Sequence, residues 1–371
     1  MANSDYDDLF RNFIFIEGKI VFLSYKFIGD FCFRGRWQIM TIRERTEQFE
    51  KQFLSPFASL SQNSLGRERK EKQCDFRTVY QRDRDRVIHS KAFRRLKHKT
   101  QVFISPERDH YRTRLTHTLE VSQIARTIAR ALLFNEDLTE AISLAHDLGH
   151  TPFGHAGEQA LSEISSNGFK HYEQSVRVIE KLEQGGKGLN LTKEVRDGVL
   201  CHTRGRQAKT VEGRIVRIAD RIAYINHDID DAVRAGVLEE SSIPREITDV
   251  LGNKRTKRID TLVASLVANS YDDVLCMDKK VQRAFDDLHA FMYEYVYRNP
   301  YAKAEEKKVP VLVGELYCYF KHHTEEIPED LQNIAKEEGA DRAVCDYIAG
   351  MTDHFAVQIF QDIFIPKAWS I

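Results

Sequence analysis

Histidines and acidic residues gather in one short segment, Ala145–Glu158, which reads AHDLGHTPFGHAGE. His146 and Asp147 are adjacent at the end of an apolar stretch, where a neutral imidazole beside a carboxylate is costly to bury unless something compensates both. A divalent cation would compensate both. Taken alone, a His-Asp pair is more often a hydrogen bond at a helix end than a metal site, so the rest of the chain must supply further ligands.

Two further ligands come from distant segments. His117 lies near the start of a helix predicted by apolar residues that recur every three or four positions from Leu115 to Leu132. A short link joins it to the helix that ends near His146, and such antiparallel neighbours place the start of one beside the end of the other. With Asp220, two imidazoles and two carboxylates make a mixed site suited to one divalent ion, Mg, Mn, Fe, Co or Ni.

Asp220 belongs to a third predicted helix with an acidic stripe. Steps of four, three, one and three place one set of polar residues on a single face, opposite Ile218, Ile222 and Ile225. These polar residues are Asp220, Tyr224, His227, Asp228 and Asp231. An acidic stripe is normally the solvent face, but this one also holds a tyrosine and a histidine, so we expect it to line a cleft.

Composition narrows the fold and the partners. The 371 residues are 42% hydrophobic and 30% charged, which is typical of globular proteins and excludes a fibre or low-complexity chain. With 19 Gly and 8 Pro and dominant helical periodicity, the chain is predicted to be all-α. The net charge of -1 gives no overall attraction to nucleic acid. The six cysteines form no C-x-x-C pair, and no uncharged apolar run approaches the ~18 residues of a membrane span, so we expect a cytoplasmic protein without a membrane partner.

One segment departs from this neutral balance. Between Arg67 and Lys99 there are thirteen Lys or Arg against five Asp or Glu, an excess of eight positive charges. Two interpretations stay open: a solvated helix face with ion pairs, or a surface for polyphosphate or single-stranded nucleic acid. The best candidates for such a surface are Arg94, Arg95, Lys97 and Lys99.

These residues resemble a known family. His117, His146-Asp147 and Asp220 match the H…HD…D pattern of the HD-domain metal-dependent phosphohydrolases. Five segments look like those of the bacterial dGTPase-like deoxynucleoside triphosphate triphosphohydrolases: Phe93–Phe103, Thr113–His117, His146–His155, Ala219–Tyr224 and Asp346–Asp353. The resemblance runs from about Met40 to the C-terminus, and it implies an all-α HD-domain helical bundle with additional C-terminal helices.

The resemblance also divides the chain into four regions. We expect an N-terminal extension at 1–39, a basic helical region at 40–111, the HD metal-dependent phosphohydrolase core at 112–235, and a C-terminal helical region at 236–371. Residues 1–39 are rich in Phe and Ile, and a charged, strongly helical segment follows Met40. We therefore interpret Met40 as the functional start and the preceding stretch, which has no counterpart in the family, as lying outside the fold. The alternative is an edge hairpin packed on the body.

The implied reaction is the hydrolysis of a dNTP to a deoxynucleoside and inorganic triphosphate, by attack of water at the α-phosphorus. His155 and Glu158, three residues apart on one helix face, are expected to form the catalytic unit, with Glu158 orienting His155. His150 is expected either to bind phosphate or to cap a helix. His171 resembles another active-site histidine of the family, with a supporting role as the alternative.

The substrate-binding residues are carried over in the same way. Arg114, one helical turn before the metal-binding histidine, is expected to point at the phosphate, and Arg221 to clamp the outer phosphates. The family suggests that Tyr224 packs on the deoxyribose, where it would hinder a 2′-hydroxyl, and that Asp228 accepts from the 3′-hydroxyl. Gln101 resembles the residue that reads the sugar or base edge. Each of these roles competes with a surface salt bridge or a helix contact.

Two alternative functions remain. The same site could act on a nucleoside monophosphate, a cyclic dinucleotide or an alarmone, and the phosphate product distinguishes these from a dNTP. A non-enzymatic alternative is a nucleotide-sensing or single-strand-binding protein that depends on the basic segment. Family members form homo-oligomers, so we expect one here, with a regulating nucleotide and single-stranded DNA as further candidate partners.

Overall fold

The computed structural model describes residues 13–16, 19–22, 40–101, 112–203, 205–299 and 305–367. They fall into two compact units, Met1–Met40 and Thr41–Ile371. In the first unit, strand β1 (Phe13–Ile16) pairs antiparallel with β2 (Lys19–Phe22), with Phe13 opposite Phe22. The rest of the expected N-terminal extension lies outside the described residues, so its place relative to the fold stays a prediction.

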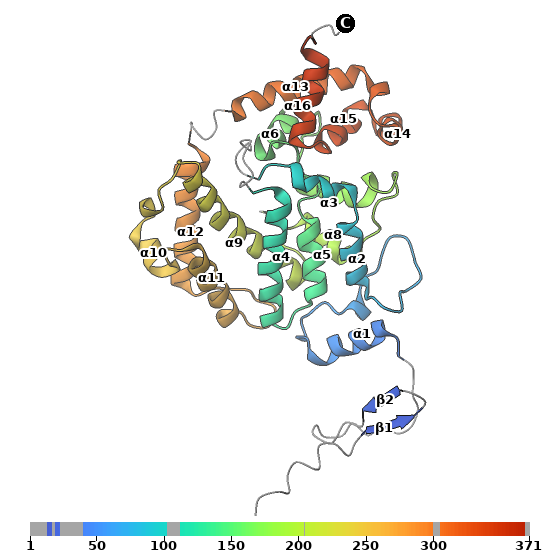
Figure 1. The fold of residues 1–371 in the computed structure, drawn as a ribbon, viewed down its shortest axis with the longest axis vertical. Helices are drawn as coiled ribbons and strands as arrows, with labels where there is room; N and C mark the ends of the chain where they lie inside the picture. The colour runs from blue at the N-terminus through green and yellow to red at the C-terminus, as the bar shows by residue number, and fades with distance from the viewer. Residues whose placement is uncertain are drawn as a thin grey trace, which may run out of the picture. The chain divides into compact units, whose positions relative to one another are not determined.

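The second unit is helical (Figure 1). Its α-helices are α1 (Ile42–Phe53), α2 (Val79–Ile88), α3 (Lys91–Arg95), α4 (Arg114–Ala131), α5 (Glu136–Ala145), α6 (Gly154–Ile164), α7 (His171–Arg177), α8 (Lys193–Leu200), α9 (Val211–Arg234), α10 (Arg245–Leu251), α11 (Arg255–Asn269), α12 (Lys279–Met292), α13 (Val309–His322), α14 (Glu329–Glu338), α15 (Ala340–Ala349) and α16 (Asp353–Phe364). The predicted all-α fold is confirmed, since the only strands among the described residues are the two of the first unit.

Side-chain caps decide where the central helices begin. The hydroxyl of Thr113 accepts the N–H of Thr116 at the start of α4. Asn135, which is buried, accepts the N–H of Leu138 at 3.1 Å and so starts α5. Asp137 and Glu140 have the spacing of a capping box, but they do not form one. Asp137 already lies inside the first turn of the helix, where its side chain cannot take the capping position.

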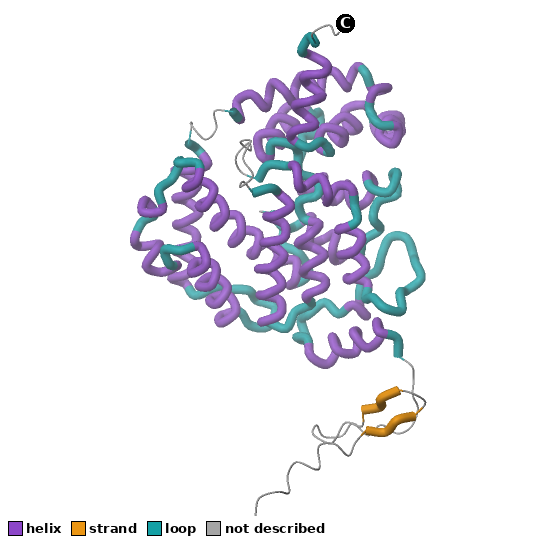
Figure 2. The backbone as a smooth tube through the Cα atoms, viewed as in Figure 1, coloured by secondary structure: helices purple, strands orange, loops and turns teal. Residues whose placement is uncertain are grey.

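The first hydrophobic core joins α2, α4, α5, α8 and α9, with α10, α11 and α12 against it (Figure 2). Leu138 and Ile142 of α5 and Ile124 and Ile128 of α4 are fully or almost fully buried there. The predicted apolar stripe of α4 is confirmed except at Leu119, which is 50% exposed. No helix among the described residues combines the length and the apolar character that a membrane crossing requires.

A second hydrophobic core joins α6 to the C-terminal helices. Phe153 and Leu161 pack in one cluster with Leu316, Phe320 and Ile348, and Figure 1 shows α6 beside α13, α15 and α16. The segment from His146 to Gly154 therefore connects a helix of the first core to a helix of the second. The residues of that segment lie where the two cores meet.

Candidate metal centre and active site

The end of α5 fixes the orientation of His146, an expected metal ligand. It follows the last residue of α5, and its Nδ1 lies 2.6 Å from the carbonyl oxygen of Ser143, to which it donates. The other ring nitrogen, Nε2, then carries the lone pair, and it is buried without a hydrogen-bond partner in the part of the chain that the structure describes. A backbone bond of this kind commonly fixes the tautomer of a metal-binding histidine.

Close packing holds the turn after His146. The N–H of Gly149 donates to Ser175 Oγ at 2.9 Å, and Ser175 Oγ donates to the carbonyl of His146 at 2.7 Å. A Cβ at position 149 would lie 2.1 Å from the backbone nitrogen of Ser175. Glycine is therefore required at this position because α7 passes directly against the turn.

Three of the four expected metal ligands converge closely. Ligand atoms of His117, His146 and Asp147 all lie within 4.8 Å of one another, and the three residues are buried. Asp220 Oδ1 lies 3.0 Å from His117 Nε2 and 3.8 Å from His146 Nε2. With an orphaned imidazole nitrogen and two carboxylates around one point, these four residues fit a divalent cation.

Asp147 is the most highly connected member of the site. Its Oδ2 accepts from Arg114 Nη1 at 2.7 Å, and both residues are almost fully buried. Its Oδ1 lies 3.5 Å from His146 Nε2 and from His150 Nε2. Burial alone would raise the pKa of Asp147, but the imidazoles and the Arg114 guanidinium hold that pKa well below its usual range. Asp147 is therefore an anion in the interior.

A second group of histidines adjoins this cluster. His150 and His171 stack with ring centroids 4.0 Å apart and planes 16° from parallel. One potential ligand atom from each of His150, His171 and Asp147 lies within 4.8 Å of the other two. Lone pairs on stacked rings run parallel instead of converging, so this pair is a poor holder for a second ion. Burial lowers the pKa of His150 well below its usual range, which leaves a neutral imidazole facing the cluster.

Glu158 reaches two histidines rather than one. Its carboxylate lies 2.9 Å from His171 Nδ1 and accepts the backbone N–H of His171 at 2.9 Å, whereas His155 Nδ1 is 3.6 Å away. Burial would raise the pKa of Glu158, but the neighbouring imidazoles of His155 and His171 hold that pKa below its usual range. The side chain of His155 is 80% exposed, so it forms the outermost part of the group.

The sugar-binding candidates lie on α9. Asp228 is buried and accepts a hydrogen bond at Oδ2 from Tyr297 Oη, while its Oδ1 has no hydrogen-bond partner among the described residues. Burial, and then the nearby carboxylate of Asp231, raise the pKa of Asp228 to about 8. Tyr224 is half-buried and its ring lies 6.1 Å from that of His289. Tyr297 could not be predicted from the sequence, because no spacing links it to α9.

The two remaining substrate candidates differ in their surroundings. Gln101 approaches the start of α6: its backbone oxygen and Arg114 Nη2 each lie 3.4 Å from where a Cβ on Gly154 would stand. Arg221 instead donates to Asp286 at 2.6 Å and lies over the ring of Phe285. Among the described residues, the hydrogen bond of the Arg221 side chain reaches Asp286 and not the expected metal ligands, so its role as a phosphate clamp stays a prediction.

His202, which lies outside the predicted motif, also belongs to the site. It is buried, and its Nε2 lies 3.9 Å from Asp147 Oδ1. Its Nδ1 lies 2.7 Å from the carbonyl of Val199, three residues earlier, as in His146. Burial is the first cause that lowers its pKa, to about 4. One signal was available: Leu200-Cys-His202 repeats the pattern Leu144-Ala-His146 at a second helix end.

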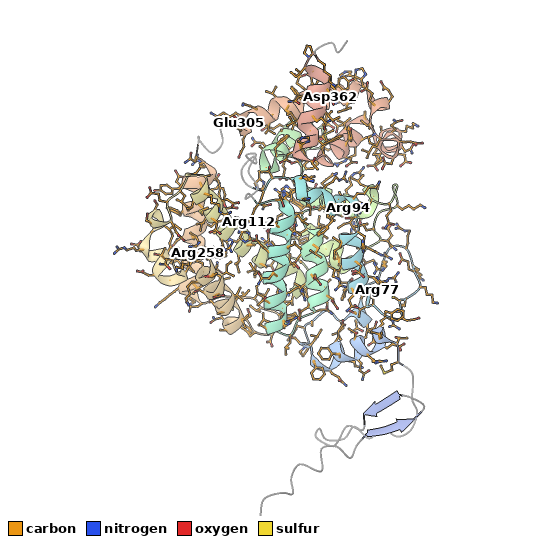
Figure 3. All side chains as sticks on the ribbon, in the orientation of Figure 1. Arg77, Arg94, Arg112, Arg258, Glu305 and Asp362 are labelled. Atoms are coloured by element: carbon orange, nitrogen blue, oxygen red, sulfur yellow. The ribbon has the colours of Figure 1, made fainter. Side chains whose placement is uncertain are left out.

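The basic segment is mostly paired within the protein. Arg67 bonds to the buried Asp83, and Arg82 and Arg86 both bond to Glu71. Lys99, expected at a binding surface, is instead 3% exposed. That expectation was wrong because its Nζ is used internally, on backbone carbonyls. Arg94, Arg95 and Lys97 are exposed (Arg94 is labelled in Figure 3).

Comparison with known proteins identifies the family of the chain. Residues 114–225 match the HD domain, and residues 275–362 match the phosphohydrolase-associated domain. The chain therefore carries the domains of an HD-domain phosphohydrolase. A deoxyguanosinetriphosphate triphosphohydrolase-like protein of Caldanaerobacter subterraneus subsp. tengcongensis is 55% identical over 331 residues, which are 89% of this chain and 98% of that protein. One of Clostridium perfringens is 49% identical over 338 residues, 88% of this chain and 99% of that protein.

The chain belongs to the dGTPase-like family of HD-domain proteins, as its motifs predicted. It is accordingly a hydrolase of the nucleotide triphosphohydrolase type.

Proposed function

We propose that this protein hydrolyses deoxynucleoside triphosphates, dGTP or dNTPs generally, to the deoxynucleoside and inorganic triphosphate. The observation that carries the proposal is the convergence of His117, His146 and Asp147 within 4.8 Å, with buried Arg114 bonded to the same aspartate. Such a site can bind a phosphate through a cation, and the guanidinium of Arg114 can donate hydrogen bonds to the same phosphate. The names of the relatives support the dNTP as substrate.

One divalent ion would be held by His117, His146, Asp147 and Asp220. When bound, it supplies positive charge beside the α-phosphate and activates water for attack. The N and O donor set suits Mg, Mn, Fe, Co or Ni. The tautomer of His146 prepares the site, because its lone pair already faces the other ligands.

Residues of the chain itself bind and orient the triphosphate. Arg114 lies directly beside the metal-binding aspartate, so its remaining N–H groups can donate to phosphate oxygens. The stacked pair of His150 and His171 forms a polar wall next to Asp147. We assign phosphate binding to His150, and to His171 the support of that wall through its bonds to Glu158.

Proton transfer to the leaving 5′-oxygen is assigned to His155. This side chain is solvent-accessible, so it can take a proton from water and deliver it to substrate. Glu158 lies 3.6 Å from His155 and hydrogen-bonds to His171, so one carboxylate orients both rings. In this arrangement Glu158 stays ionised, because its pKa is held below the usual range.

Sugar recognition is assigned to α9 and to Gln101. Asp228 offers an oxygen without a partner among the described residues to the 3′-hydroxyl. Tyr224, about one helical turn after Asp220 on α9, would pack on the deoxyribose. Gln101 has a buried Oε1 without a hydrogen-bond partner among the described residues, beside the start of α6. That atom can accept from a sugar hydroxyl or a base edge.

Product analysis tests the proposal. Each dNTP and rNTP is incubated with Mn or Mg, and the phosphate product is separated by chromatography. We expect triphosphate from dNTPs and none from His146→Ala, whose helical circular dichroism stays that of the wild type. Orthophosphate or pyrophosphate as the only product would favour the alternative substrates, and full turnover by His146→Ala would refute the metal assignment.

The proposed surroundings follow from the same family. We propose a cytoplasmic homo-oligomer, with a regulating nucleotide and single-stranded DNA as further partners. The last of these has the least support, since most of the arginines of the basic segment are used in internal ion pairs and Lys99 is buried. Binding to single strands that weakens steeply with salt would support it.

A further inference from the structure

A buried lysine ties the histidine loop to the C-terminal helices. The Nζ of Lys99 donates to the carbonyl of His150 and, at 2.7 Å, to the carbonyl of Ala349. Burial lowers the pKa of Lys99 well below its usual range. Both bonds persist whether the group is charged or neutral, because a neutral amine still has two N–H donors.

An aspartate of α16 holds the same loop at a second point. Asp353 Oδ1 accepts the backbone N–H of Phe153, and Asp353 Oδ2 accepts the backbone N–H of Thr100, both at 2.9 Å. The hydroxyl of Thr100 also donates to Oδ2. One carboxylate therefore joins the segment that carries Gln101 to the loop that precedes His155.

The backbone at this point needs such support. Phe153 has φ +60° and Gly154 has φ +56°, both left-handed. That conformation costs about 1–2 kcal/mol for a residue with a side chain. Phe153 occupies the N-cap position of α6, but its side chain makes no capping hydrogen bond. The carboxylate of Asp353 instead holds the turn by accepting the backbone N–H of Phe153. Since His155 is the second residue of α6, any relaxation of the turn would move it.

The C-terminal region also holds the helix that carries His171. Asp346 of α15 accepts from Gln174 Nε2 at 2.8 Å and from Arg177 Nε at 2.8 and 2.9 Å. Both donors belong to α7. The segment Asp346–Asp353 therefore supports the two stacked histidines from both sides, although none of its own side chains contacts the metal ligands in the described contacts.

We propose that Asp353 and Lys99 are positioning residues for hydrolysis, which hold the His150–His155 segment in its reactive geometry and so make the C-terminal helices part of the active site. The inference rests on the proposed function for its kinetic consequence. The restraint of residues 150–155 by the C-terminal segment does not depend on that function, because it can be measured without substrate.

The test compares Asp353→Asn with Asp362→Asn. Asp362, labelled in Figure 3, lies on the same helix but is exposed, and its carboxylate pairs with Lys367. In Asp353→Asn an amide NH₂ replaces one acceptor and faces an N–H donor. We expect kcat to fall about 30- to 100-fold, with KM and the dissociation constant of Mn each changed less than about threefold. Amide hydrogen exchange in residues 150–155 should accelerate at least about tenfold, whereas Asp362→Asn matches wild type in every measurement.

The outcomes distinguish a failure of the positioning role from a failure of the proposed function. Unchanged kcat or unchanged exchange in a folded Asp353→Asn protein overturns the positioning role, and so does a fall in Mn affinity that parallels the fall in kcat, because that indicates general loosening. If Asp353→Asn does not fold, Thr100→Val, which removes only one donor to Asp353, decides by the same readouts. If the wild type hydrolyses no dNTP, the proposed function fails, and the exchange comparison alone decides whether Asp353 restrains the loop.

Discussion

Replacing Asp228 with Asn is expected to change how the stability of this protein depends on pH. Asp228 is buried, and its Oδ1 has no hydrogen-bond partner among the described residues. Burial, followed by the charge of Asp231, raises its pKa to about 8, whereas an aspartate in an unfolded chain has a pKa of about 3.9. Between these two values the folded protein binds one proton more than the unfolded chain.

The sign and size of the effect follow from that proton. The contribution of Asp228 to the free energy of unfolding is fully present below pH ~4 and is lost as the pH rises toward 8. One proton corresponds to about 1.4 kcal/mol per pH unit, or about 2.7 kcal/mol between pH 5.5 and 7.5. Asparagine does not titrate and retains an oxygen that can accept from Tyr297, so the variant should gain about this much on wild type over that range.

Urea unfolding followed by circular dichroism at pH 5.5, 6.5 and 7.5, with a chelator present, measures the difference between the two proteins. Subtracting the unfolding free energy of the wild type from that of the variant cancels the contributions of the other titrating groups. Asp362→Asn, a substitution at an exposed position, serves as the control. A difference in unfolding free energy that stays constant within about 0.5 kcal/mol from pH 5.5 to 7.5 would refute the reasoning, since Asp228 would then be ionised throughout.

Three other predictions follow from the contacts described above. Arg67→Ala should lower the free energy of unfolding by about 3 kcal/mol, because it leaves the fully buried Asp83 without its ion-pair partner. Arg77 is half-exposed, so Arg77→Ala should lower that free energy by less than about 0.5 kcal/mol. Equal losses for the two variants in urea unfolding would contradict this prediction. Glu158→Gln should reduce kcat about 100-fold and leave Mn binding, measured by titration calorimetry, unchanged; weaker Mn binding would argue against its assigned place. Tyr224→Ala should lower the ratio of kcat/KM for dNTP over rNTP at least about tenfold, and an unchanged ratio would remove the tyrosine from sugar selection.

Much of the metal centre could be predicted from local patterns. Helical periodicity placed α4 and α9, and the short link between α4 and α5 brought His117 to His146. These inferences succeed because a helix repeats every 3.6 residues and a short connection leaves neighbours antiparallel. The assignment of roles to His150, His155, His171 and Glu158 stays a prediction, although the structure does bring them together.

The sequence by itself determined the family, the all-α fold and the residues able to bind a cation, because these depend on residue types at short spacing. Only the tertiary structure decided that Lys99 is buried, that His202 faces Asp147, that Tyr297 bonds to Asp228, and that Glu158 bonds to His171. Each of these depends on how segments far apart in the chain pack against one another. Burial converts an apparent surface cation into an internal donor, and no local pattern encodes burial between distant helices.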